Sequence, residues 1–128
     1  METLAEMFER SAGRNLSDPA QKYKGGVYER SLANADAVDA APDGEYATLS
    51  YEELRDVVRS LAAGFRALGL EPGQRVGMFA DTRMEWAQCD FALLAAGGVV
   101  TTVYKSSSPE QVRYLLGDPG AIGVVVEN

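Results

Sequence analysis

The sequence contains no histidine, and this absence excludes several kinds of chemistry. Without imidazole there is no His-based catalytic triad, no histidine-containing zinc site and no general base of the commonest type. Cys89 is the single cysteine, so an internal disulfide framework is excluded as well. A lone thiol fits the reducing environment of the cytoplasm.

Basic charge and long hydrophobic runs are also scarce. Lys and Arg number 12 against 19 Asp and Glu, and the resulting net charge of −7 would repel a nucleic-acid backbone. No apolar run approaches the roughly 20 residues that cross a bilayer, and the N-terminus lacks the basic start and apolar core of a signal peptide. We therefore expect a cytoplasmic protein whose membrane association, if any, is peripheral.

The 128 residues, 46% hydrophobic and 24% charged, are enough for one globular domain. Residues 1–45 are predicted to form an N-terminal helix and an acidic loop segment. A capping box of Thr3 with Glu6 indicates a helix over 2–11, with Leu4, Met7 and Phe8 on one face. The pattern then weakens. Within 13–45 we expect a short strand at 27–28 and a solvated loop over ANADAVDAAPDGE.

Residues 46–128 show a much clearer alternation of strand and helix. Strands are predicted at 46–49, 75–80, 99–104 and 122–126. Helices follow three S/T-x-x-E/Q capping boxes, which are Ser50 to Glu53, Thr82 to Glu85 and Ser108 to Gln111. The first of these helices ends at Gly69. Its predicted core face consists of Leu54, Val57, Val58, Leu61, Ala62, Phe65 and Leu68.

This alternation with short loops predicts parallel strands joined by right-handed crossovers, and apolar strands predict a sheet covered on both faces. The expected fold class is therefore α/β, a partial doubly wound, mainly parallel sheet with flanking helices. The last strand, Ile122 to Val126, is expected to be left with an exposed edge and an exposed apolar face.

Ligands of such sheets bind at the carboxyl ends of the strands, which are followed here by the loops after Ala80 and Tyr104. The second loop belongs to TTVYKSSSPEQVRY, whose strand, hydroxyl-rich loop and helix start are typical of phosphate sites. However, the sequence has no GxGxxG and no GxxxxGK[ST], and a helix cap accounts for 108–111. Lys105, Ser106 and Ser107 stay unexplained, either lining a cleft or facing water. Tyr104 and Lys105 lie at the carboxyl end of a predicted central strand, and they are the two residues of this stretch that are expected to face a cleft.

Other conspicuous side chains are better explained by structure than by chemistry. Trp86 and Cys89 lie on an apolar predicted helix and are interpreted as packing residues, because no basic neighbour in sequence lowers the thiol pKa. Asp90 is predicted to be either paired or at the edge of that interface. Glu52-Glu53 and Asp81 are interpreted as charges favoured by the helix dipole.

An ordered set of phrases resembles the N-terminal portion of the AMP-forming acyl-CoA synthetases in the adenylate-forming superfamily, and most closely the long-chain fatty-acid–CoA ligases. It consists of Leu49-Ser50-Tyr51-Glu52-Glu53, Ala62 to Gly69, Pro72-Gly73-Gln74-Arg75-Val76, Glu85-Trp86 with Asp90, Ala92 to Gly97, and Ser108 to Leu116. The segment Pro19 to Lys24, which precedes these phrases in the chain, also resembles a segment of the long-chain fatty-acid–CoA ligases. The resemblance implies that residues 46–128 are the start of an AMP-binding domain and that this domain is incomplete in the sequence.

The resemblance implies a ligase that uses ATP and Mg²⁺ to activate a fatty acid as an acyl-adenylate and then transfers the acyl group to coenzyme A. The family's Ser/Thr/Gly-rich phosphate loop, its Tyr-Gly-x-Thr-Glu segment, its ribose-binding Asp and its late lysine are absent from this sequence. No catalytic, cofactor-binding or metal residue is therefore assigned, and no cofactor is expected to bind the chain alone. The alternative hypothesis is a stand-alone, non-catalytic α/β module that binds a ligand or a protein.

Overall fold

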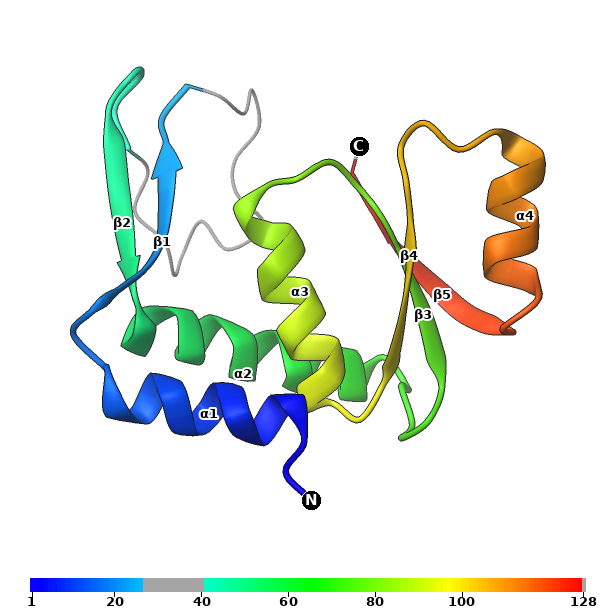
Figure 1. Cartoon of the computed structure of the whole chain (residues 1–128), viewed down its shortest axis with the longest axis horizontal. Helices are drawn as coiled ribbons and strands as arrows, with labels where there is room; N and C mark the ends of the chain where they lie inside the picture. Colours follow the sequence, from blue (N-terminus) through cyan, green and yellow to red (C-terminus); the bar gives the residue numbers. More distant parts are fainter. Residues whose placement is uncertain (27–40, 128) are drawn as a thin grey trace.

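A computed structural model describes residues 1–26 and 41–127 of the chain (Figure 1). The strand predicted at 27–28 and most of the predicted acidic loop lie outside the described residues. The elements in chain order are α1 (Leu4–Arg14), β1 (Pro19–Lys24), β2 (Tyr46–Ser50), α2 (Tyr51–Ala67), β3 (Arg75–Phe79), α3 (Met84–Ala95), β4 (Val99–Val103), α4 (Pro109–Gly117) and β5 (Ala121–Val126).

The second half of the chain forms a parallel sheet with helices on both faces. Its three strands lie in the order β4-β3-β5, and β3 pairs in parallel with both neighbours. One face is covered by α3, with α2 and α1 beyond it, and α4 lies on the opposite side (Figure 1). This arrangement confirms the predicted α/β class with a mainly parallel, doubly wound sheet.

A separate two-stranded sheet joins the two predicted parts of the chain. In it β1 runs antiparallel to β2, with Lys24 opposite Tyr46 and Lys22 opposite Thr48. β1 is not predicted from the sequence, because PAQKYK carries only one large apolar residue. Tyr23 is that residue, and its burial in the core together with the pairing to β2 accounts for the strand.

Three helices begin with a complete capping box, as predicted. In each box the N-cap hydroxyl accepts a hydrogen bond from the N3 backbone N–H, and the N3 side chain accepts one from the N-cap N–H, an exchange worth about 1 kcal/mol per cap. The pairs are Thr3 with Glu6, Ser50 with Glu53, and Ser108 with Gln111. Glu52 and Glu53 lie in the first turn of α2, in agreement with their predicted role.

The capping box predicted at the start of α3 is wrong. The N-cap is Arg83 rather than Thr82, and no side chain caps this end of the helix. Glu85 is unable to act as the partner of a cap because its carboxylate accepts two hydrogen bonds from the Arg83 guanidinium, at 2.9 and 3.0 Å. An ion pair therefore replaces the predicted cap.

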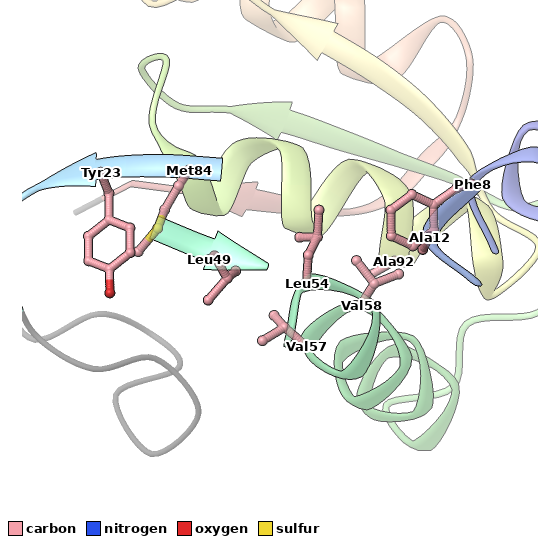
Figure 2. Close-up of a cluster of buried hydrophobic side chains, with 9 residues drawn as sticks. All are labelled: Phe8, Ala12, Tyr23, Leu49, Leu54, Val57, Val58, Met84 and Ala92. Carbon is pink, nitrogen blue, oxygen red and sulfur yellow. The ribbon is translucent and has the colours of Figure 1, made fainter. Parts of the chain in front are cut away.

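One hydrophobic core lies where α1, α2 and α3 meet the two-stranded sheet. Figure 2 shows its buried side chains, with Tyr23 and Met84 at one end and Phe8 and Ala12 at the other. Phe8 stacks on Phe91 of α3, with ring centroids 4.5 Å apart. The face predicted for α1 is only partly right, because Phe8 is buried whereas Leu4 and Met7 are exposed.

The core face of α2 is confirmed over most of its length. Leu54, Val57 and Val58 are buried, and Leu61, Ala62 and Phe65 pack against the core. Leu68 is the exception, with 87% of its surface exposed. Because it is the C-cap residue, it lies beyond the face that α2 presents to the core, and Gly69 follows in a left-handed conformation at φ +104°.

A second core lies between α3 and the parallel sheet. Its buried members are Leu70, Val76, Met78, Leu93 and Ala96, with Trp86 and Cys89 packed against them as predicted. β5 lies at an edge of the sheet and is largely exposed, as its sequence predicted, and its exposed large apolar residues are Ile122, Val124 and Val126. Within the described ranges, no helix has the length and apolar character needed to cross a bilayer.

Candidate functional site

Charged residues from the segments that follow the three parallel strands lie together at one edge of the sheet. β3, β4 and β5 run in the same direction in register, ending at Phe79, Val103 and Val126. The segments that follow contribute the side chains that meet at this edge, which are Asp81, Arg83, Glu85, Lys105 and Glu127. This is the edge where the sequence analysis expected ligands to bind.

Lys105 forms an ion pair with Asp81 at this edge. Its Nζ lies 2.5 Å from Asp81 Oδ2, and the backbone N–H of Asp81 donates to Glu127 Oε2 at 2.9 Å. Hydrogen bonding to Asp81 raises the pKa of Lys105. The interpretation of Asp81 as a helix-terminus charge is therefore wrong, because α3 begins only at Met84 and the carboxylate is directed to Lys105.

Arg83 connects β5 to the start of α3. Besides its bonds to Glu85, its Nη1 lies 3.3 Å from Glu127 Oε1. The side chains of Arg83 and Glu85 are only 18% and 11% exposed, so solvent screens this pair less than a surface ion pair. Separating these groups would leave a partly buried charge without its partner, which costs free energy. The ion pairs of Arg83 with Glu85 and Glu127 therefore keep the edge in one arrangement.

The edge does not fit a magnesium triphosphate. Its two cations are outnumbered by three carboxylates, and Lys105 and Arg83 are already paired with them. Among the described residues there is also no group of three or more His, Cys, Asp or Glu able to hold a metal ion. We therefore derive no ATP-dependent step from this edge.

The serines before α4 have local structural roles or face water. Ser106 is exposed, and the backbone N–H of Ser107 donates to the carbonyl of Tyr104 at 3.0 Å, closing a turn. Tyr104 is 79% exposed. Beside this turn lies an open cavity of about 570 Å³ lined by Tyr104, Ser107, Glu110, Gln111, Tyr114 and Leu115.

Comparison with known proteins gives the family. A family model described as AMP-binding enzyme matches residues 28–128. The chain belongs to this family. Among curated proteins, the long-chain-fatty-acid–CoA ligase FadD15 of Mycobacterium bovis is 41% identical over 85 residues, which cover 66% of this chain and 14% of that protein. Mouse long-chain-fatty-acid–CoA ligase ACSBG2 is 25% identical over 126 residues, covering 98% of this chain and 16% of that protein.

Solved structures share the fold of this chain. The N-terminal subdomain of Klebsiella oxytoca NpsA in complex with 3-hydroxyanthranilyl-AMSN superposes with a TM-score of 0.77 at 17% identity, over 100% of this chain and 28% of that chain. The nonribosomal peptide synthetase FmoA3 in its AMPPNP-bound form gives 0.73 at 23% identity, over 98% of this chain and 11% of that chain. The chain thus spans only a small part of each of these relatives.

The roles of Arg83 and Glu127 in this member of the AMP-binding family are not predicted from the sequence. Both lie just beyond the carboxyl ends of neighbouring strands, and that position is the signal that would have drawn attention to them. Lys105 was identified by the same argument. Its contact with Asp81 depends on parallel pairing of β3 with β4, which the strand pattern did predict.

Cys89 and Asp90 differ in how the fold accommodates them. Burial, with a smaller contribution from Glu85, raises the pKa of the Cys89 thiol, so Cys89 behaves as a packing residue. Asp90 is half-buried, and no hydrogen bond or ion pair to it is found in the described part of the chain. Burial alone raises the pKa of its carboxyl group. Of the two predicted environments, the edge of the interface is the observed one.

We expect Asp90→Asn to stabilise the protein at pH 7, with a gain that disappears in acid. Because the folded-state pKa of Asp90 is raised, the native state binds the proton more tightly than the unfolded chain. The stability linked to this proton is fully present below the ordinary pKa of 3.8 and is lost as pH rises through the folded pKa. Urea unfolding at pH 7 and pH 3.5 measures the difference, with exposed Asp18→Asn as control. An equal gain at both pH values would refute this account.

Proposed function

We propose that this chain serves an AMP-forming acyl-CoA synthetase that activates a long-chain fatty acid with ATP and Mg²⁺ and transfers it to coenzyme A. The observation that carries the proposal is the 41% identity over 85 residues to a long-chain-fatty-acid–CoA ligase. The cofactors and the fatty acid belong to the whole ligase. We place the enzyme in the cytoplasm, with any contact to a membrane being peripheral.

In this proposal the chain contributes structure, and other segments of the ligase polypeptide contribute the chemistry. Stabilising a transferring phosphoryl or adenylyl group requires donors and cations aimed at the phosphates. The sequence has no glycine-rich phosphate loop, and the cations at the carboxyl edge are held by carboxylates. We therefore propose that 46–128 begin the AMP-binding domain and that the chain is inactive alone.

The test is ATP–pyrophosphate exchange driven by a long-chain fatty acid. The purified chain is expected to give no exchange above a blank without enzyme. A chimaera of mycobacterial FadD15, in which the 85 aligned residues are replaced by those of this chain, is expected to keep exchange within about tenfold of the parent ligase, because substitutions that preserve core volume and pattern are tolerated.

Two outcomes would contradict separate parts of the proposal. Exchange by the isolated chain would show that the chemistry lies within it. A chimaera that folds, as judged by circular dichroism and thermal melting, but gives no exchange would contradict the ligase assignment and favour the alternative of a stand-alone binding module.

A further inference from the structure

A second cavity lies between the two-stranded sheet and the start of α3, and its charge is opposite to that of the whole protein. Its volume is about 380 Å³, and its described lining residues are Gln21, Lys22, Tyr23, Lys24, Tyr46, Thr82, Arg83 and Met84. These include three cations and no carboxylate, although the chain carries a net charge of −7. At physiological ionic strength charges more than about 8 Å away are largely screened, so the net charge of the chain contributes less at the cavity than the cations that line it.

Two of these cations are held near each other by the fold. Tyr23 is buried in the core, and because side chains alternate along a strand, Lys22 and Lys24 both point to the opposite face of β1. Their ammonium groups lie 5.5 and 5.8 Å from the centroid of the Tyr46 ring on β2. The buried Tyr23 and the cross-strand pair of Lys24 with Tyr46 therefore fix the backbone that carries both charges.

Neither lysine is neutralised by the described residues. Arg10, Arg59, Arg83 and Lys105 all form ion pairs. Lys22 and Lys24 lie over the ring of Tyr46, and neither has a carboxylate partner among the described residues. Arg83 borders the cavity, but Glu85 and Glu127 balance its charge, so the uncompensated positive charge is that of the two lysines.

We propose that this cavity binds a phosphate group. Two like charges on one small face repel each other, and a dianion placed between them removes that repulsion while accepting hydrogen bonds from both ammonium groups. A phosphate group at neutral pH carries about 1.5 to 2 negative charges and has several acceptor oxygens, whereas a carboxylate carries one charge. The Thr82 hydroxyl and the Gln21 side chain line the same cavity as polar groups. The cavity borders the carboxyl edge at Arg83, but the lysines that would hold the phosphate lie on β1, and the proposal does not depend on the ligase assignment.

The experiment is a titration of the full chain, labelled with ¹⁵N, with inorganic phosphate at pH 7.5. The backbone amides of 21–24 and Tyr46 are expected to shift in a saturable manner. The double variant Lys22→Gln/Lys24→Gln is expected to bind at least about tenfold more weakly, since charged hydrogen bonds are lost. Arg75→Gln/Arg113→Gln removes the same charge from exposed positions that form no ion pair among the described residues, and it should stay within about twofold of the parent.

Two arms distinguish a soluble phosphate compound from a lipid headgroup. Saturable shifts with inorganic phosphate identify a site for a soluble phosphate. Flotation with phosphatidic acid vesicles but not phosphatidylcholine vesicles, abolished in Lys22→Gln/Lys24→Gln, identifies a lipid phosphate. The proposal is overturned if neither probe binds, if the lysine variant and the arginine control lose affinity equally, or if acetate binds as tightly as phosphate. Lys22→Arg/Lys24→Arg keeps both charges and is expected to retain binding.

Discussion

Leu93→Ala is expected to lower the free energy of unfolding by about 4 kcal/mol, the usual cost of an alanine in place of a fully buried leucine. Leu93 has no exposed surface and packs in the same core as Met78, which is 1% exposed on β3. The truncation leaves a cavity between α3 and the sheet that the helix is unable to close without losing its other contacts. Since a domain of this size is stable by about 5–15 kcal/mol, much of the total stability is lost.

Urea unfolding measured by tryptophan fluorescence tests this prediction. Trp86 is the one tryptophan of the chain and packs against the same core, so its emission reports the loss of this interface. Leu68→Ala is the matched control, because Leu68 is 87% exposed and its truncation is expected to change the free energy by less than about 0.5 kcal/mol. If Leu93→Ala costs no more than the control, then α3 does not pack on the sheet as described.

The parts of the fold that the sequence predicts well are those determined by nearby residues. The capping box of Ser50 with Glu53 needs only four consecutive residues, and the structure forms it as predicted. The parallel sheet follows from the order of strands and helices, because a helix between two neighbouring strands returns the chain in the same direction. That order also placed Lys105 at the carboxyl edge.

The parts that the sequence predicts poorly depend on distant partners. β1 is a strand because it pairs with β2, more than twenty residues away, and because Tyr23 finds a place in the core. The box predicted at Thr82 fails because Arg83 binds the Glu85 carboxylate, a choice reinforced by Glu127 from the other end of the domain. The local pattern favours the cap, and only the three-dimensional arrangement shows that the ion pair forms instead.

Arg83→Gln is the second substitution with a large expected effect, a loss of about 2 to 3 kcal/mol in the free energy of unfolding. The guanidinium is bound to Glu85 through two hydrogen bonds and lies 3.3 Å from Glu127. Glutamine is unable to satisfy both carboxylates, and the Glu85 side chain, 11% exposed, is left as a largely buried charge without a cation. Because Glu127 follows β5, we also expect faster hydrogen exchange at the backbone N–H of Asp81, which donates to Glu127.

Arg75→Gln is the control for Arg83→Gln. Comparing their losses in the free energy of unfolding separates the effect of the ion pairs from the effect of removing one positive charge. Arg75 is exposed at the start of β3, and its removal makes the same change in net charge without disturbing an ion pair among the described residues. The double variant Arg83→Gln/Glu85→Gln should recover part of the loss, because the unpaired buried carboxylate is then gone as well. A loss equal to that of Arg75→Gln, or a double variant whose loss equals the sum of the two single losses, would mean that solvent screens the pair. With the coupling present, Arg83 connects β5 to the start of α3 and so fixes the arrangement of the carboxyl edge.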